Sequence, residues 1–256
     1  MAIELYDDGE HACWMFEDSI DDSADAVQAN QFLIVNGNSA ALIDPGGNIA
    51  YNNILMARQR YWPSRSLDFI LASHADPDII ASLSKWFVQS DCKLVISRVW
   101  ARFAPHFCTK KDQSQGRIIP IPDKGMDIHL GDAVIKALPA HFLHSEGNFQ
   151  FYDTVSKILF SGDMGASMVP HHTIGEAVAD FDAHLPSMEG FHRRYMSSNK
   201  VCRYWVNMVR TLDIDAIVPQ HGRYFKGEAM VTRFLNWVDQ LECGIDLVTQ
   251  NDYRVP

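Results

Sequence analysis

Four short apolar runs, each typical of a buried strand, are followed directly by histidine or aspartate. They are LDFILAS at 67–73, AVIKALPA at 133–140, KILFS at 157–161 and IDAIVPQ at 214–220. The chain continues from them into His74-Ala75-Asp76-Pro77-Asp78, His141, Gly162-Asp163 and His221-Gly222. Strand ends that feed short loops present side chains rigidly at one place, as a metal site requires. A single such residue could equally cap a turn. Four such strand ends together predict a metal site.

Apolar runs and turn signals also alternate along the rest of the chain. Strands are expected at 31–35, 40–43, 67–73, 93–97, 117–122, 126–130, 133–139, 148–153, 157–160 and 214–218, and helices at 49–62, 77–88, 98–107, 187–212 and 227–250. No internal repeat, low-complexity segment or Ser/Pro/Gly-rich linker divides the 256 residues. This order of elements predicts one domain, residues 1–256, with mixed sheets inside and helices outside, of the α/β or α+β class.

Composition narrows the classes of function. The formal net charge of −10 disfavours a polyanionic partner such as nucleic acid. No stretch approaches the roughly 20 apolar residues that a membrane span needs, and the start MAIELYDDGEH lacks the basic-then-apolar order of a secretory signal. The five cysteines are widely spaced and never form a CxxC pair, which favours free thiols in a reducing compartment. We therefore expect a cytoplasmic protein that does not insert into membranes.

The spacing of the strand-end residues also resembles that of a known superfamily. The series His74-x-Asp76-x-Asp78, then His141, Asp163 and His221, resembles the metallo-β-lactamase superfamily, whose first motif is H-x-H-x-D-H. A carboxylate in the third place resembles the flavodiiron branch, H-x-E-x-D-H. The resemblance covers nearly the whole chain, through ALIDPG, SHADPD, FSGD and VPQHG. It implies an α+β fold, an αβ/βα sandwich in which helices flank two central β-sheets.

Two departures from the flavodiiron pattern indicate a subgroup. Ile79 stands where the motif ends in a ligating histidine, and no flavodoxin-like FMN domain or rubredoxin-like domain is expected before the chain ends at Pro256. Both features resemble the stand-alone oxygen-binding di-iron proteins, which are associated with oxygen sensing. The segment His141-Phe-Leu-His144-Ser-Glu-Gly-Asn148 fits that group better than it fits a hydrolase.

The resemblance implies a ligand for each metal position. One metal would take His74, Asp76 and His141, the second would take Asp78 and His221, and Asp163 would bridge them. Because Ile79 cannot ligate, the second metal would keep an open or water-filled position, unless His144, His171 or His172 fills it. His171 and His172 could instead orient a ligand, and Tyr152 or Tyr195 could donate a hydrogen bond to bound oxygen.

The chemistry of the ligands favours iron independently of the resemblance. Three histidines and three carboxylates, without a thiolate, suit iron or manganese, although zinc competes for such a set. We therefore expect two iron ions (Fe2+/Fe3+), with zinc or manganese as substitutes and no FMN. Three carboxylates and two divalent ions leave a net charge of about one positive, which favours an anionic adduct of the peroxo type.

Electron count then favours an oxygen binder or sensor. Reduction of O2 to water takes four electrons, and two Fe(II) ions supply only two. Faster turnover would need an external electron donor. One alternative is therefore an O2 or NO reductase, that is, a flavodiiron-like oxidoreductase that receives electrons from a separate flavoprotein. The other alternative is a dinuclear zinc hydrolase. The expected partners are O2 or NO and either a signalling protein or an electron donor. The helical stripe Val201, Trp205, Met208 and Leu212 indicates buried core or the face of a homodimer.

Overall fold

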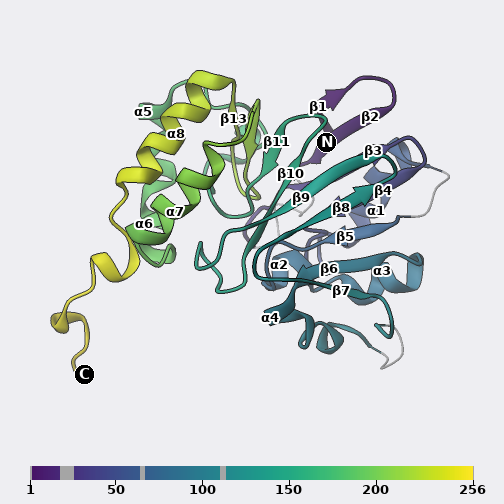
Figure 1. The fold of residues 1–256 in the computed structure, drawn as a ribbon, viewed down its shortest axis with the longest axis horizontal. Helices are drawn as coiled ribbons and strands as arrows, with labels where there is room; N and C mark the ends of the chain where they lie inside the picture. The colour runs from purple at the N-terminus through teal and green to yellow at the C-terminus, as the bar shows by residue number, and fades with distance from the viewer. Residues whose placement is uncertain (1, 18–25, 64–66, 110–113, 256) are drawn as a thin grey trace.

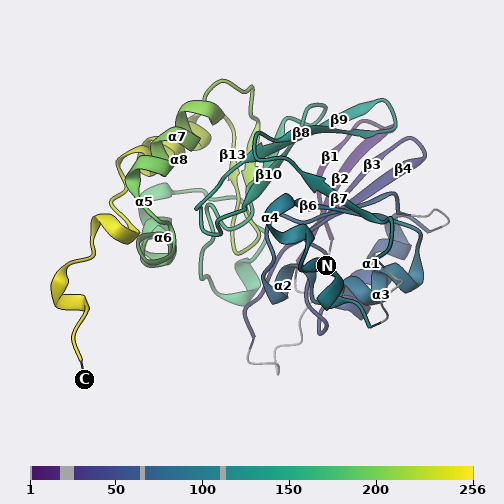
Figure 2. The same cartoon turned by 60° about the horizontal axis from the view of Figure 1, so that its bottom comes forward.

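A computed structural model describes residues 2–17, 26–63, 67–109 and 114–255. Two β-sheets pack face to face at the centre of the molecule, and helices cover the outer face of each sheet (Figures 1 and 2). The fold is the predicted α+β sandwich. Within the described ranges, no helix combines the length and the apolar character that crossing a membrane would need.

The first sheet contains seven strands in sequential order. They are β1 (Ala2–Asp7), β2 (His11–Phe16), β3 (Gln31–Asn36), β4 (Ser39–Ile43), β5 (Phe69–Leu71), β6 (Lys93–Ser97) and β7 (Ile118–Ile121). Strands β1 to β4 pair antiparallel, whereas β4 to β7 pair parallel. Parallel neighbours need crossover connections, and these carry the helices of this half.

The second sheet contains six strands in the order β13-β12-β11-β10-β9-β8. They are β8 (Met126–Leu130), β9 (Ala133–Pro139), β10 (Phe149–Asp153), β11 (Ile158–Phe160), β12 (Ala216–Val218) and β13 (Phe225–Lys226). All pairs are antiparallel except β11 with β12, which run parallel. The crossover between these two strands carries most of the helices of the second half.

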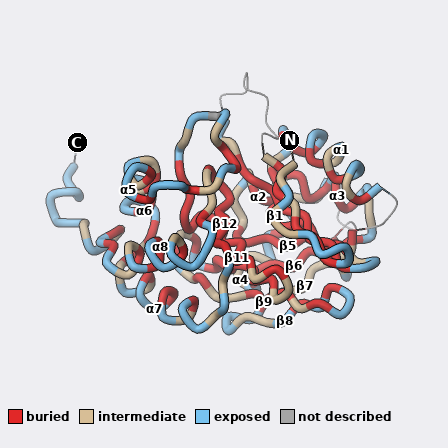
Figure 3. The backbone as a smooth tube through the Cα atoms, turned by 90° about the horizontal axis from the view of Figure 1, so that it is seen from above, coloured by how far each residue is buried: buried red, intermediate tan, exposed pale blue. Residues whose placement is uncertain are grey.

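The helices form the two outer layers. Those of the first half are α1 (Tyr51–Tyr61), α2 (Pro77–Ile80), α3 (Leu83–Gln89), α4 (Arg98–Ala101) and the 3₁₀ helix η1 (Ala104–Phe107). Those of the second half are η2 (His171–Thr173), α5 (Phe181–His184), η3 (Leu185–Ser187), α6 (Glu189–Tyr195), α7 (Asn199–Val209), α8 (Glu228–Gln240), η4 (Gly244–Asp246) and η5 (Gln250–Asp252). Figure 3 shows the strands largely buried and the segment after α8 largely exposed.

Strand β3 illustrates how this sequence forms a four-layer fold. Its side chains alternate between two cores: Phe32 and Ile34 face the second sheet, whereas Leu33 and Val35 face the helices. A strand buried on both faces has a continuous apolar run rather than an alternating one. Across the central core, Phe32 packs against Phe160 of the other sheet, with ring centroids 4.9 Å apart.

Several predicted elements differ from the structure in extent. The predicted helices at 77–88 and 187–212 are each divided, and the predicted helix at 227–250 ends at Gln240. Strands β1, β2 and β13 were not predicted. The second strand begins with His11 and continues in the apolar run 12–16, of which Ala12, Cys13, Met15 and Phe16 are buried. The stripe on α7 is core: Trp205 is buried, and Val201, Met208 and Leu212 pack around the same cluster.

Candidate metal centre

Three of the four predicted strand ends bring their side chains together at one edge of the sandwich. His74 follows β5, Asp163 follows β11 and His221 follows β12, while Asp76 stands immediately before α2. Backbone hydrogen bonds join these ends, from the Phe149 amide to the Ser73 carbonyl at 2.9 Å and from the Gln220 amide to the Gly162 carbonyl at 2.8 Å. The edge is therefore a single rigid platform formed by both sheets.

Asp163 lies at the centre of two groups of side chains. Its Oδ2 atom lies 2.9 Å from His144 Nε2 and 3.7 Å from His74 Nε2, and both of these nitrogens lie 3.5 Å from Asp76 Oδ2. Its Oδ1 atom lies 3.5 Å from His221 Nε2, which in turn lies 3.5 Å from Asp78 Oδ2. One carboxylate thus turns a separate oxygen to each group, as a carboxylate that bridges two metal ions does.

Unsatisfied polar atoms support this interpretation. Among the described residues, Asp163 Oδ1 and His144 Nε2 are buried without a hydrogen-bond partner. His144 Nε2 lies close to Asp163 Oδ2, but its N–H direction misses that oxygen, so the two atoms are neighbours without being hydrogen-bonded. Buried polar atoms normally have partners, and metal ions bound between these donors would supply them. The residues therefore fit a dinuclear metal centre.

Hydrogen bonds on the outer side of the rings fix two histidines in the tautomer that ligation needs. Ser73 Oγ lies 2.9 Å from His74 Nδ1 and donates to Asp44 Oδ2, so Nδ1 is the protonated nitrogen of His74. His221 Nδ1 lies 2.7 Å from the Gln28 carbonyl and donates to it. In both rings Nε2, which faces the carboxylates, is then the nitrogen left to bind a metal. Neither Asp44 nor Gln28 was predicted to contribute, although Asp44 lies in the ALIDPG segment that carries the resemblance.

The structure corrects the prediction for the loop between β9 and β10. His141 lies outside the cluster: its Nε2 donates to the Asp123 carbonyl at 2.8 Å, and its ring packs edge-on against Phe149. His144 occupies the predicted position instead, beside His74 and Asp163. The reason is the course of the loop, which turns at Phe142 with a φ of 67° and returns to place His144 over the platform. The Asn148 amide holds this turn by donating to the Leu143 carbonyl.

The other residues singled out in the sequence lie in different places. Tyr195, which is about half exposed, packs edge-on against the His144 ring at 5.5 Å. Tyr152 is remote from the cluster, because its hydroxyl donates to the Asp213 carbonyl on the far side of the second sheet. His172 is exposed, and the side chain of His171 lies outside what the structure describes. Ile79 is fully buried and belongs to the hydrophobic core that also includes residues of α1 and α3.

Charge and burial act in opposite directions on this cluster. Burial alone would raise the pKa of Asp163, but His144 and His221 more than offset it and hold that pKa well below the usual value. Conversely, burial would lower the pKa of His144, and Asp163 and Asp76 raise it to about 10. The same balance raises the pKa of His221 to about 9. Without a metal the histidines hold protons in its place, so cations and protons compete for the cluster.

A cavity of 670 Å³ opens directly onto the cluster. Asp76, Asp78, His144, Asp163 and His221 lie on its floor. Its walls are mainly apolar and include Val27, Ile49, Met168, Phe191 and Tyr195. A small apolar molecule can therefore reach the cluster, whereas a strongly hydrated one would lose solvation on the way.

Two face-to-face sheets with histidines and aspartates at their strand ends define the class of metallo-β-lactamase-like proteins. Residues 27–222 match the model of a family described as ODP family beta lactamase, and the chain belongs to this family. It resembles the structure described as the apo state of chemotaxis sensor ODP from T. denticola, with 38% identity, a TM-score of 0.84 and coverage of 99% of both chains. A second structure, described as the peroxy diiron species of chemotaxis sensor ODP, matches with the same identity and TM-score.

More distant relatives share the fold alone. A mutant flavo di-iron protein from Thermotoga maritima is 19% identical with a TM-score of 0.75, and the match covers 93% of this chain and 60% of that one. An uncharacterized protein of Methanocaldococcus jannaschii is 24% identical over 202 residues, 77% of this chain and 49% of that protein. The chain thus spans about half the length of the curated relatives it matches.

Proposed function

We propose that this protein binds O2 at a di-iron centre and acts as an oxygen sensor. The arrangement around Asp163, which turns one oxygen to each of two His/Asp groups, is the observation that carries the proposal. Support comes from the structure of a chemotaxis sensor, described as a peroxy diiron species, that is 38% identical over 98% of the chain. A family relationship of that extent favours the same cofactor at the same edge of the sandwich.

The ligands divide between the two groups. In the first iron position we place His74, Asp76 and His144, and in the second Asp78 and His221, with Asp163 shared. Mixed imidazole and carboxylate ligands without a thiolate suit iron. When bound, two Fe(II) ions supply two electrons to O2. The second position has one protein ligand fewer, because Ile79 cannot ligate and is buried in the core, so an exchangeable ligand such as O2 could be accommodated there.

The protein's own side chains control what reaches this position. The apolar cavity wall admits O2, and Tyr195, which packs against the His144 ring, is the nearest phenol from the cavity side. Within the cluster His74, Asp163 and His221 are buried, whereas Asp76 and Asp78 are partly exposed toward the cavity. Small molecules therefore approach the cluster through the apolar cavity, on the side of these two aspartates.

Anaerobic loading with Fe(II) followed by air tests the proposal. We expect close to two irons per chain and a visible absorption band that appears with O2 and persists for minutes. Rapid bleaching with excess reductant, together with steady O2 consumption, would instead identify an O2 reductase. Two zinc ions that iron cannot displace, without an optical response to O2, would move the function to hydrolysis.

A pair of alanine variants tests the ligand assignment. His144→Ala should lose at least one of the two irons and the oxygen-dependent band, because His144 Nε2 faces both Asp76 and Asp163. His141→Ala should retain both, since that side chain binds only the Asp123 carbonyl. Because His144 and His141 lie in the same loop, a general disturbance of that loop would affect both variants alike. The opposite pattern would restore His141 as the ligand.

A further inference from the structure

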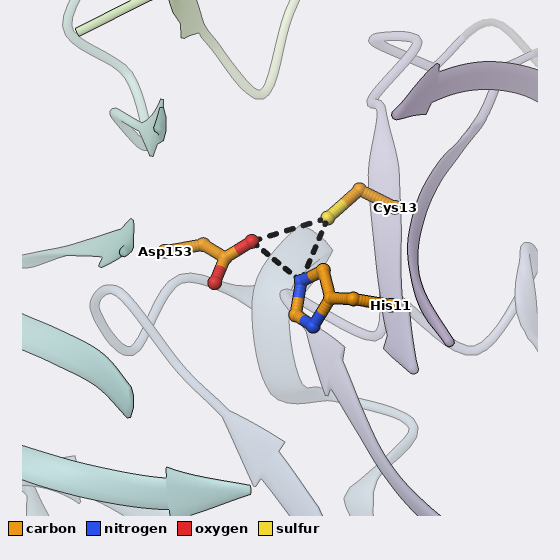
Figure 4. A group of neighbouring side chains, drawn as sticks. All are labelled: His11, Cys13 and Asp153. Carbon is orange, nitrogen blue, oxygen red and sulfur yellow. Dashed lines mark hydrogen bonds and ion pairs between the residues drawn. The ribbon is translucent and has the colours of Figure 1, made fainter. Parts of the chain in front are cut away.

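A second cluster of potential metal ligands lies between the sheets, outside the centre described above. His11 and Cys13 stand at alternate positions of β2, so both side chains leave the same face of the strand. Asp153, the last residue of β10, approaches them from the opposite sheet (Figure 4). All three residues are 0–1% exposed. The H-x-C pair and the carboxylate thus converge in the dry interior of the sandwich.

The donor atoms already lie near the spacing that a small tetrahedral cation imposes. Zinc bonds of about 2.0–2.3 Å to nitrogen, oxygen and sulfur separate neighbouring donor atoms by about 3.4–3.6 Å. Cys13 Sγ lies 3.4 Å from Asp153 Oδ2 and 3.8 Å from His11 Nε2. His11 Nε2 and Asp153 Oδ2 are closer, at 2.7 Å, because a hydrogen bond joins them. Insertion of an ion would require only this pair to separate.

The surroundings hold the His11 ring in the orientation that ligation needs. Its Nδ1 lies 3.1 Å from Asn36 Oδ1. The Asn36 amide group donates to the Leu130 carbonyl and to Asp132 Oδ1, so its carbonyl oxygen is the atom turned toward the ring. A carbonyl that accepts from Nδ1 leaves Nε2 to the metal, which is the usual outer support of a ligating histidine.

Protons occupy the position between the three donors in the structure. Both ring nitrogens of His11 face acceptors, so the ring carries two protons, and the Cys13 thiol also donates to Asp153 Oδ2. Ser156 donates its hydroxyl to the same carboxylate and lies 3.6 Å from Cys13 Sγ, on the remaining side of the cluster. Imidazolium, carboxylate and thiol sum to zero charge. Thiolate, carboxylate, neutral imidazole and one divalent ion also sum to zero.

We propose that His11, Cys13 and Asp153 form a second metal site that binds Zn2+ as a structural ion joining the two sheets. Binding releases two protons, one from the imidazolium and one from the thiol, and leaves the charge of the buried cluster unchanged. The thiolate gives the site a preference for zinc over iron. The site is independent of the di-iron centre, which lies at the opposite end of β10 and, among the described residues, includes no cysteine.

Cobalt substitution tests the site separately from the proposed function. Full-length protein is expressed in cobalt-supplemented medium, because a metal ion should enter so deeply buried a site only while the protein folds. We expect thiolate-to-cobalt charge-transfer absorption in the near ultraviolet and one bound metal more than the di-iron centre takes. The absorption reports sulfur ligation only, so it appears whether or not the histidine and aspartate centre is filled.

Cysteine variants locate the thiolate. Cys13→Ser should lose the band and one metal equivalent, whereas Cys108→Ser and Cys202→Ser should keep both. Cys108 is partly exposed and Cys202 lies 3.8 Å from Cys243, so these two test the other thiols that could bind cobalt. A band that survives Cys13→Ser, or wild-type protein without a band, overturns the proposal.

If Cys13→Ser does not fold, X-ray absorption of zinc-loaded protein that keeps Cys13 decides. A sulfur neighbour at about 2.3 Å from zinc, in protein whose other four cysteines are replaced by serine or alanine, supports the site. Zinc that has nitrogen and oxygen neighbours but no sulfur neighbour would overturn the proposal.

Discussion

Both ends of the sandwich bring histidine and aspartate side chains together, but the two ends differ in the hydrogen-bond partners that these side chains find. At the edge formed by the ends of β5, β11 and β12, Asp163 Oδ1 and His144 Nε2 are buried without hydrogen-bond partners and a cavity opens onto them. At the opposite end of β10, Asp153 accepts from His11, Cys13 and Ser156 and from two backbone amides, and these four side chains are buried.

This difference in hydrogen bonding distinguishes a centre that can exchange ligands from a cluster that stabilises the folded protein. Donor atoms left unsatisfied near a cavity lower stability in the absence of metal, and they remain available to bind ions that react. A fully hydrogen-bonded cluster between two sheets contributes to folding with or without an ion. Variants at the two ends should therefore differ in what they change: metal content at one end, and the free energy of unfolding at the other.

Removal of the carboxylate at the sealed end should give the largest change in stability. Asp153→Ala leaves the His11 imidazolium buried without its partner, which should cost about 3–5 kcal/mol of unfolding free energy. Iron content at the other end should not change. Urea denaturation of the metal-free protein measures the loss. Asp127→Ala is the matched control, because the Asp127–Lys136 pair is exposed and should contribute less than about 1 kcal/mol. Equal effects of the two variants would contradict the distinction between the ends.

The contrast also explains what the sequence could and could not predict. The SHADPD, FSGD and VPQHG segments follow strands directly, so their positions at the platform follow from strand order alone. The choice between His141 and His144 does not, because both lie in one loop and its turn at Phe142 decides which side chain faces the platform. Strand periodicity carries no information about the course of a loop.

The sealed cluster was invisible in the sequence for a different reason. His11 and Asp153 are 142 positions apart, and neither belongs to a motif. The first hairpin was not predicted, although β2 carries an apolar run at 12–16, because the alternation of β1 is weak and leaves that run without a recognisable partner strand. A contact of this kind follows only from the register that packs one sheet on the other.

Two buried histidines outside the proposed iron ligands, His192 and His11, should respond to pH in opposite directions. Near the metal centre, His192 is fully buried, accepts from the Gly165 amide at 2.8 Å and is held neutral by burial, which lowers its pKa to about 4. The neutral ring stabilises the folded state fully above the unfolded pKa of about 6.5, and this stabilisation is lost as the pH falls toward 4. The free energy of unfolding then decreases by up to about 1.4 kcal/mol per pH unit and by about 3 kcal/mol in total. His11 is the reverse case: burial opposes protonation, but Asp153 raises its pKa, so its contribution is present below about 6.5 and is lost as pH rises.

Unfolding of metal-free protein between pH 4 and 8 measures both slopes. The difference between wild type and His192→Gln should shrink as the solution is acidified, whereas the difference between wild type and His11→Gln should shrink as it is made alkaline. Taking differences removes the contribution of the other titrating groups. Parallel slopes for the two variants would show that His192 and His11 do not differ in protonation as their hydrogen bonds indicate.

The smallest effect we predict sharpens the comparison within a single strand. Asp44 follows the end of β4 and accepts from both the amide and the hydroxyl of Ser73, which orients His74, whereas Asp68 accepts from the Ala40 amide at the other end of β4. Asp44→Asn should weaken iron binding at the His74 position by about 10–100-fold, since outer partners of metal ligands have effects of this size. Asp68→Asn makes the same change from carboxylate to amide without touching a ligand, so its iron affinity should equal that of wild type. Iron titration against a chelator measures both. Equal affinities in the two variants would mean that Ser73 and the backbone hold the His74 ring without Asp44, and the proposed route from β4 to the metal centre would then be absent.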